Sequence, residues 1–268
     1  MTEKVLIAGC GDTGNALGRR LLEAGCDVFG ARRTTSALQP GIHPLQLDLT
    51  RPESWEWATV QFDYVFYMPT PDTRDEAGYR AIFVDGLRAL LGRLQGQQRP
   101  VKRLFFVSST AVYGLSDGEW VDEDSATEPS RFNGQVLLEA EAAASEQAIP
   151  ATVARFSGIY GKGSVRLLER VRSGETYDPE RWTNRIHVED CAGMLEHLMR
   201  MDEPAACYLG NDDAPSQMGE VVAFLSEALG VALPPAGTSK SLNKRCSNRR
   251  LRASGYRLQY PTYREGYA

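Results

Sequence analysis

Short apolar runs alternate with amphipathic stretches along the first part of the chain. Lys4–Ala8 is a continuous run that stops at Gly9, as a buried parallel strand does. From Thr13, apolar residues recur at helical spacing until about Gly25, and a second short strand, Asp27–Ala31, follows. The opening unit is therefore strand, glycine turn, helix and strand.

The same alternation continues over the next hundred residues. The further strands that it predicts are Leu45–Leu47, Tyr64–Tyr67, Arg103–Ser108 and Ala151–Phe156, and the helices cover about Glu76–Leu94 and Ser130–Gln147. Regular alternation of this kind is typical of a parallel sheet with helices on both faces. The sequence therefore predicts an α/β fold with a doubly wound parallel sheet, the Rossmann arrangement.

The alternation of strands and helices becomes less regular beyond Gly158. It predicts a helix Val165–Arg172, a strand near Arg185–Val188, a helix with Asp190 as its N-cap, and a helix Ser216–Leu229 with Gly230 at its C-cap. We therefore expect a dinucleotide-binding core over residues 1–160. Residues 161–268 should form mainly a small C-terminal α/β substrate lobe, with some segments returning to the core.

The glycine turn after the first strand carries the clearest chemistry. Gly9, Gly11 and Gly14 form a GxGxxG motif between a strand and a helix, with Asp12 and Thr13 inside it. Gly9 permits the tight turn, Gly11 lets a pyrophosphate approach the backbone, and Gly14 allows close helix packing. The amides of the helix N-terminus can then bind the anion, so the turn predicts dinucleotide binding.

The end of the second strand indicates which dinucleotide is bound. An NAD site usually places an acid there, but this chain has Arg32 and Arg33. Guanidinium groups suit a 2′-phosphate, so we expect NADP(H) to be preferred and NAD(H) to be possible. The alternative is that both arginines are simply solvated. Asp48, after the third strand, is expected near the adenine or at the cap of a turn.

Composition narrows the class of protein. The 268 residues are 42% hydrophobic and 24% charged, and no apolar run approaches the roughly 20 residues that cross a bilayer. Five cysteines without a CxxC pair and three histidines without zinc spacing favour a reducing compartment and no structural metal. We therefore expect a cytoplasmic protein with no membrane contact, and a homodimer stays open as its oligomeric state.

Charge is unevenly distributed, although the net value of −5 argues against a general nucleic-acid binder. The segment from Lys240 to the end holds eight of the 30 basic residues and one of the 35 acidic residues, so it carries +7 and the rest −12. Leu242, Leu251 and several tyrosines interleave with these charges. A basic segment docked on an acidic body is favoured over a nucleic-acid arm, and an anionic small ligand is the alternative.

Four further segments carry a family resemblance. They are Ser108–Gly114 (SSTAVYG), Trp120–Glu123 with Pro129, Arg155–Gly161 (RFSGIYG) and Arg185–Asp190 (RIHVED). With them the chain resembles an extended short-chain dehydrogenase/reductase of the NAD-dependent epimerase/dehydratase family. Asn184 and the tail segments 244–248 and 260–267 make it most similar to the atypical, YeeZ-like branch, although its glycine turn departs from the family's usual TGxxGxxG.

The resemblance implies a catalytic Ser, Tyr and Lys, of which only the serine is found. Ser109 matches the Ser, whereas anchoring on Gly134 and Glu141 puts Asn133 at the Tyr position and Leu137 at the Lys position. A tyrosine works near neutral pH only when a neighbouring cation lowers its pKa, so the usual mechanism does not carry over. A helix position that is often Asn in the family is Phe83.

Other residues take the remaining roles in this interpretation. Ser108 is assigned to the cofactor, and Thr110, Asn133 and Arg185 to the substrate, with pairing to an acid as the alternative for Arg185. Two loop tyrosines, Tyr113 and Tyr160, are candidate proton donors, although a wall or packing role is favoured for each. Structural or solvated roles are favoured for the other polar and aromatic candidates, which are Lys162, His187, Asp122, Glu123, Asp124, Trp120 and Trp182.

Two functions remain open. One is an NADP-dependent oxidoreductase or epimerase-like enzyme on a small, sugar-like or nucleotide-linked substrate, with Ser109 polarising a substrate oxygen. The other is a non-catalytic redox sensor or regulatory protein that holds NADP(H). Retention of Ser109 and of the segment Arg155–Gly161 favours the enzyme, whereas loss of the Tyr and the Lys favours the sensor.

Overall fold

A seven-stranded parallel sheet forms the centre of the molecule, in a computed structural model that describes residues 2–55, 60–162, 165–238 and 243–268. The strand order is β3-β2-β1-β4-β5-β7-β11. The strands are β1 (Lys4–Ala8), β2 (Asp27–Arg32), β3 (His43–Gln46), β4 (Tyr64–Tyr67), β5 (Arg103–Ser109), β7 (Ala151–Phe156) and β11 (Cys207–Gly210). The order reverses between β1 and β4, so the predicted doubly wound α/β fold is confirmed.

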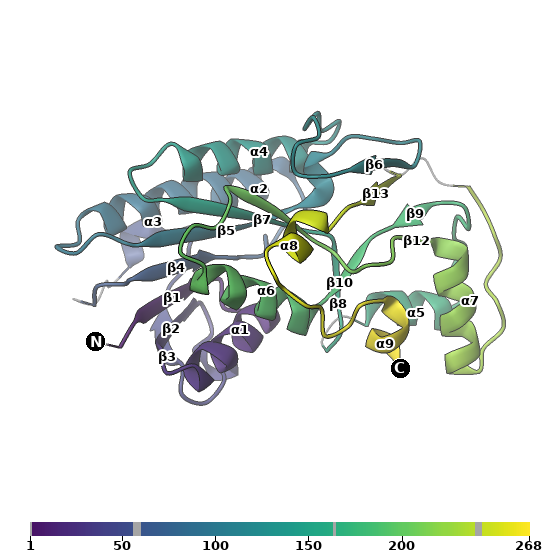
Figure 1. Ribbon diagram of the computed structural model, residues 1–268, viewed down its shortest axis with the longest axis horizontal. Coiled ribbons are helices and arrows are strands. Elements are labelled where there is room, and N and C mark those ends of the chain that lie inside the picture. The colour runs from purple at the N-terminus through teal and green to yellow at the C-terminus, as the bar shows by residue number, and fades with distance from the viewer. Residues whose placement is uncertain (1, 56–59, 163–164, 239–242) are drawn as a thin grey trace.

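Helices cover both faces of this sheet (Figure 1). One face carries α2 (Glu76–Tyr79), α3 (Gly86–Gln95) and α4 (Phe132–Ser145), and the other carries α1 (Asp12–Glu23) and α6 (Val188–Arg200). Strand side chains alternate between the faces: Leu6 packs on the α3 and α4 side, whereas Val5 and Ile7 pack on the α1 and α6 side. β1, β4 and β5 are apolar on both faces because helices cover each face, which is why the sequence shows continuous apolar runs there.

The long helix predicted at about Glu76–Leu94 contains an irregular stretch. A π-helical segment, η3 (Arg80–Asp85), joins α2 to α3. The Tyr67 hydroxyl donates a hydrogen bond to the Ile82 carbonyl in this segment. Phe83 is buried there against Phe106 and Tyr79, so this aromatic ring occupies the core.

Three two-stranded sheets and four helices form the rest of the structure. The strand pairs are β8 (Gly158–Tyr160) with β10 (Arg185–His187), β9 (Trp182–Thr183) with β12 (Ser216–Gln217), and β6 (Glu119–Val121) with β13 (Lys244–Cys246). The helices are α5 (Arg166–Arg172), α7 (Met218–Leu229), α8 (Arg249–Ala253) and α9 (Tyr263–Tyr267), and the 3₁₀ turns are η1 (Thr35–Ala37), η2 (Pro52–Ser54) and η4 (Thr110–Val112). The helix predicted from Ser216 begins two residues later because Ser216 and Gln217 form β12. Gly230 is the predicted C-cap of α7, with a φ of 65°.

Asp190 has a different role from the predicted N-cap. Helix α6 begins at Val188, and His187 is its N-cap. The Asp190 carboxylate is fully buried and accepts hydrogen bonds from the Tyr256 hydroxyl at 2.9 Å and from the amides of Gln259 and Tyr260 at 2.7 and 2.8 Å. It therefore anchors the C-terminal segment to α6 rather than starting the helix.

The basic C-terminal segment lies on acidic residues of the body, as the charge pattern predicts. Arg250 forms two 2.7 Å hydrogen bonds to Asp124 and lies 3.8 Å from Glu123, and Arg252 pairs with Asp213. Leu251 is buried beside them. Lys240 and Leu242 lie outside the described residues. Among the helices that the structure describes, none combines the length and apolar character needed to cross a bilayer.

Replacing Asp190 tests whether the C-terminal segment depends on one carboxylate. The change Asp190→Ala removes the acceptor of three hydrogen bonds, so we expect the free energy of unfolding to fall by about 2 kcal/mol in urea denaturation. Its neighbour Glu189 forms a surface ion pair with Arg19 at 2.6 Å, and Glu189→Ala should cost about 0–1 kcal/mol. Equal losses for the two variants would contradict the anchoring role of Asp190.

A second buried carboxylate, Asp212 after β11, predicts a pH dependence. Burial raises the pKa of Asp212 to about 7, although its Oδ1 accepts a hydrogen bond from the Ala214 amide. Between about pH 4 and 7 the folded protein keeps this proton while the unfolded chain loses it, so stability falls as pH rises. The stability advantage of Asp212→Asn over the natural protein should grow across this window, by up to about 1.4 kcal/mol per pH unit, and stay level above it. Urea denaturation at pH 4.5, 6 and 7.5 measures it, and a constant difference at all three pH values would contradict it.

Candidate functional site

Gly9 and Gly11, in the turn after β1, differ in the space around their Cα atoms. Gly9 has a φ of +87°, and a Cβ atom there would lie 2.5 Å from the backbone of Pro69. A Cβ on Gly11 would meet nothing within 4 Å. Gly9 therefore lets the turn pass close to the loop after β4, whereas Gly11 faces a cavity of about 190 Å³ at the carboxyl ends of β1, β2, β3 and β4.

Helix α1 points its N-terminus toward this turn. Gly11 is its N-cap and offers no side-chain cap, so Asp12 and Thr13 bring first-turn amides that lack a capping partner. Gly14 lets the helix pack closely, since a Cβ there would lie 3.1 Å from Ile7 and 3.2 Å from the sulfur of Cys10. Uncapped amides and the positive end of the helix dipole suit an anionic group such as a diphosphate.

Arginines and carboxylates line the far side of the same cavity. Arg32, Arg33 and Asp48 line it together with Gly9 and Gly11, so the structure brings these five predicted residues together. Arg32 donates a hydrogen bond to the Cys10 carbonyl at 3.1 Å. The Asp48 carboxylate accepts hydrogen bonds from the Thr50 amide at 3.0 Å and hydroxyl at 2.7 Å, so it does cap a turn.

One acid that lines this cavity was not predicted from the sequence. Asp72, on the loop after β4, accepts two hydrogen bonds from Arg33, with Nη2 and Oδ1 2.6 Å apart. The bond to Asp72 raises the pKa of Arg33. Both side chains are more than half exposed. No local pattern near the second strand signals Asp72, because it reaches the site from another strand's loop.

Ser109 ends β5 and begins the turn η4. Its Oγ accepts a 3.2 Å hydrogen bond from the Ala111 amide, which leaves the hydroxyl proton able to donate. Thr110 beside it is buried, and Cys246 on β13 forms a side-chain hydrogen bond with Thr110. Ser109 lies at the same edge of the sheet as the glycine turn but does not line the 190 Å³ cavity.

The strand residue before Ser109 belongs to a buried polar network. The Ser108 hydroxyl donates to Glu141 at 2.6 Å, and Glu141 forms an ion pair with Arg155 at 2.7 Å. Arg155 also donates to the Tyr113 hydroxyl at 2.7 Å, and that hydroxyl donates to the Asp122 carbonyl. Contact of Ser108 with a cofactor stays a prediction, since its hydroxyl is bonded within this network.

The structure does not support either loop tyrosine as a proton donor. Tyr113 is fully buried, and burial raises its pKa. Tyr160 is 3% exposed, donates to the Thr262 carbonyl and packs against Tyr267, and burial raises its pKa as well. A tyrosine with a raised pKa and a bonded hydroxyl is a poor acid or base near neutral pH, so both have packing roles.

The positions of the missing Tyr and Lys lie on α4. Asn133 is half-buried in the first turn of α4, and Leu137 is buried in the core. Gly134 brings this helix against the turn at Ala111, where a Cβ would lie 2.5 Å from the carbonyl. Neither side chain can supply the acid and cation of the usual pair.

A lysine from the C-terminal segment reaches the Ser109 turn instead. Lys244, on β13, is 7% exposed and donates to the Tyr113 carbonyl at 3.2 Å. Burial lowers the pKa of Lys244. Its position is held by β13, which pairs with β6, and by Asn184, which donates to the Lys244 carbonyl. This cation was not predicted from the sequence, because it lies 107 residues further along the chain than Leu137.

His187 has the structural role that was favoured for it. Its Nδ1 accepts from the Glu189 amide, its ring lies 3.8 Å from that of Tyr260, and burial lowers its pKa. Arg185 is buried beside a different cavity, away from the glycine turn. Lys162 is exposed.

The other acidic and aromatic candidates are held by structural contacts. Asp122 accepts from the Ser125 hydroxyl, Glu123 from the Leu209 amide, and Asp124 from Arg250. Arg245 lies between the rings of Trp120 and Trp182, 5.1 and 4.9 Å from their centroids. Across the described ranges, no group of three or more His, Cys, Asp or Glu side chains gathers as a metal would need.

Solved structures share this architecture over nearly the whole chain. A structure from Methylobacillus flagellatus, assigned as an NAD-dependent epimerase/dehydratase, is 37% identical with a TM-score of 0.85, over 100% of this chain and 97% of that one. MoeE5 in complex with UDP-glucose and NAD is 21% identical, with a TM-score of 0.81 over 98% and 95% of the two chains. Human epimerase family protein SDR39U1 with NADPH is 20% identical, with a TM-score of 0.79 over 98% and 96%.

A family model identifies the family from the sequence, whereas a search of curated proteins finds no match to this chain. The model of the NAD dependent epimerase/dehydratase family matches residues 5–207, which include the glycine turn, Ser109 and the buried Glu141–Arg155 pair. The chain therefore belongs to the NAD-dependent epimerase/dehydratase family.

Proposed function

We propose that this protein is an enzyme that binds NADP(H) at the glycine turn and acts on a small molecule beside Ser109. One observation carries the proposal: the uncapped N-terminus of α1 opens through Gly11 onto the cavity lined by Arg32 and Arg33. The arrangement fits a dinucleotide, because the α1 amides suit a diphosphate and the arginines suit a further phosphate. The NAD of MoeE5 and the NADPH of human SDR39U1 support a nicotinamide dinucleotide here.

The preference for NADP(H) rests on Arg32 and Arg33. The ion pair of Arg33 with Asp72 is exposed, with side-chain exposures of 58% and 53%. Exposed pairs contribute about 0–1 kcal/mol, so a phosphate can displace Asp72 at small cost. The Arg32 guanidinium has further N–H groups beside the one bonded to Cys10.

Ser109 is the residue of this chain that we place at the reacting oxygen. The bound cofactor supplies hydride transfer. The Ser109 hydroxyl, held by the Ala111 amide, donates a hydrogen bond to a substrate carbonyl or alcohol oxygen. Lys244 donates a hydrogen bond to the Tyr113 carbonyl and so holds η4, the turn that follows Ser109. Because the Asn133 amide cannot donate the proton, another acid must supply it. The substrate that we propose is a small, sugar-like molecule.

A regulatory role is the second candidate. Asn133 and Leu137 replace the proton-transfer pair, and Tyr113 and Tyr160 are buried, so the described site has no tyrosine ready to donate. A protein of this kind would hold NADP(H) without turnover. The two candidates share the dinucleotide cavity and differ in whether Ser109 takes part in chemistry.

Cofactor binding has a direct test in the arginines. In fluorescence titrations, Arg32→Ala combined with Arg33→Ala should raise the Kd for NADPH about 30-fold, roughly 2 kcal/mol, because charge-assisted bonds to the phosphate are lost. The Kd for NADH should change less than about threefold. Arg74→Ala, an exposed arginine outside the cavity, is the matched control.

Tighter binding of NADH than NADPH by the natural protein would refute the phosphate assignment. Gly11→Val tests the diphosphate site separately. Its side chain would enter the space that Gly11 leaves open, so the fold should persist while affinity for both dinucleotides falls.

Turnover separates the enzyme from the sensor. With NADPH and a library of small carbonyl compounds, we expect loss of the 340 nm absorbance, and Ser109→Ala should slow it about 100-fold because one oriented donor is removed. Ser116→Ala, an exposed serine after the same turn, should leave the rate unchanged. Equal rates for Ser109→Ala and the natural protein would remove Ser109 from the mechanism, and no turnover despite NADPH binding would favour the sensor.

A further inference from the structure

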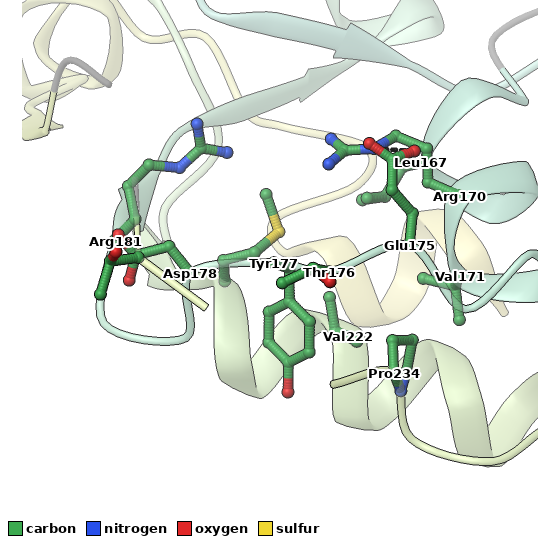
Figure 2. Close-up of a pocket in the computed structure, with 12 residues that line it drawn as sticks. Leu167, Arg170, Val171, Glu175, Thr176, Tyr177, Asp178, Arg181, Val222 and Pro234 are labelled. Carbon is green, nitrogen blue, oxygen red and sulfur yellow. Dashed lines mark ion pairs between the residues drawn. The ribbon is translucent and has the colours of Figure 1, made fainter. Parts of the chain in front are cut away.

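Ion pairs at the rims of two cavities differ in how the chain brings their members together. Figure 2 shows Arg170 and Glu175 at a cavity of about 290 Å³ between α5, α7 and the loop that precedes β9. Their side chains lie 2.9 Å apart, and the Glu175 amide donates to the Arg170 carbonyl, so the turn after α5 sets this pair locally. Arg33 and Asp72, at the 190 Å³ cavity of the glycine turn, lie 39 residues apart. Their pair forms only because the loops after β2 and β4 meet beside this cavity.

The loop that carries Asp72 is anchored at both of its ends. At its start, Pro69 lies so close to Gly9 that a Cβ on this glycine would be 2.5 Å from the Pro69 backbone. At its end, Asp75 caps α2 by accepting a hydrogen bond from the Gly78 amide at 2.8 Å. The glycine turn and α2 therefore hold between them the short loop that brings Asp72 to the cavity.

Asp72 binds the part of Arg33 that a phosphate would use. Its carboxylate accepts from both terminal nitrogens of the guanidinium, with Nη2 and Oδ1 2.6 Å apart. Arginine binds phosphate oxygens through the same two parallel hydrogen bonds. Arg33 also lines a neighbouring cavity of about 370 Å³, as do Leu47 and Asp48, so it stands where the two cavities meet. The protein therefore places an anion of its own at the position proposed for the 2′-phosphate.

The second arginine at the end of β2 has a different partner. Arg32 donates to the Cys10 carbonyl at 3.1 Å, and this neutral acceptor does not balance its charge. A 2′-phosphate can therefore bind Arg32 through the remaining N–H groups, whereas it must displace a carboxylate from Arg33. The two guanidinium groups should thus contribute unequally to phosphate binding.

An acid at this position has different consequences for the two dinucleotides. NAD(H) carries a hydroxyl where NADP(H) carries the 2′-phosphate, so the Arg33–Asp72 pair can stay formed when NAD(H) binds. The phosphate of NADP(H) has to displace Asp72 and is repelled by its charge at short range. We propose that Asp72 is a specificity-determining residue, which competes with the 2′-phosphate for Arg33 and so weakens the preference for NADP(H). This inference rests on the proposed function and adds how the site discriminates between the two cofactors.

Neutralising Asp72 tests the competition directly. In fluorescence titrations of the full chain, Asp72→Asn should lower the Kd for NADPH about three- to fivefold, because the phosphate no longer competes for Arg33. The Kd for NADH should change less than about twofold. Glu76→Gln removes an exposed acid at the start of α2, outside the cavity, and as the matched control it should change neither Kd.

Fragments of the cofactor isolate the contribution of the 2′-phosphate. Adenosine 2′,5′-bisphosphate and AMP differ only in that group, and both can be titrated calorimetrically. Asp72→Asn should tighten binding of the bisphosphate about three- to fivefold and leave that of AMP within about twofold. Weaker binding of the bisphosphate would overturn the inference, because it would mean that Asp72 orients Arg33 for the phosphate rather than competing with it.

The effect of Asp72 must disappear when Arg33 is absent. In the Arg33→Ala background, Asp72→Asn should change the Kd for NADPH less than about 1.5-fold, and an equal gain with and without Arg33 would contradict the competition. NADPH binding that Asp72→Asn leaves unchanged would overturn this inference while the proposed function stands. If neither dinucleotide binds to the natural protein or to the variant, the proposed function fails and this inference fails with it.

Discussion

In a parallel sheet every strand ends at the same edge, and the candidate site depends on that geometry. β1 runs into Gly9, β2 ends at Arg32, Asp48 follows β3, and Ser109 ends β5. The register of β1 with β2 and β4 fixes where these ends stand relative to one another. Residues at the ends of different strands therefore contribute to one surface, although the segments that carry them lie far apart in the sequence.

Because helices cover both faces of the sheet, polar side chains buried near that edge need partners within the protein. The Glu141–Arg155 pair links α4 to β7 and uses the hydroxyls of Ser108 and Tyr113 as further partners. Breaking such a pair leaves an uncompensated charge, so these groups are constrained together. This explains why Tyr113 is unavailable for chemistry while Ser109, one residue beyond Ser108, keeps a hydroxyl proton to donate.

The C-terminal segment contacts the Ser109 turn, α6 and Arg185. It brings the ammonium of Lys244 to the Ser109 turn, and Asp190 holds the stretch from Tyr256 to Tyr260 on α6. Its last helix places Tyr267 on Arg185. This segment, which the sequence shows as a basic tail, therefore contributes contacts to the turn, to α6 and to Arg185.

The sheet and the glycine turn could be predicted from the sequence because their signals are local. Apolar runs mark the strands, and Gly9, Gly11 and Gly14 mark the turn. The charge pattern predicts that the basic C-terminal segment lies on the body, but the individual residue contacts between distant segments could not be predicted. Asp190 has the residue type of an N-cap, but its carboxylate binds amides near residue 260, and Asp72 reaches Arg33 from another strand's loop. Tyr160 follows a strand as a site residue would, yet the C-terminal helix buries it.

The most direct test of the account is a crystal structure of the protein with saturating NADPH. We expect the diphosphate within hydrogen-bond distance of the Asp12 and Thr13 amides, the 2′-phosphate at Arg32 and Arg33, and the nicotinamide on the side of Ser109. A cofactor bound elsewhere, or a glycine turn that stays free of it at saturation, would contradict the account.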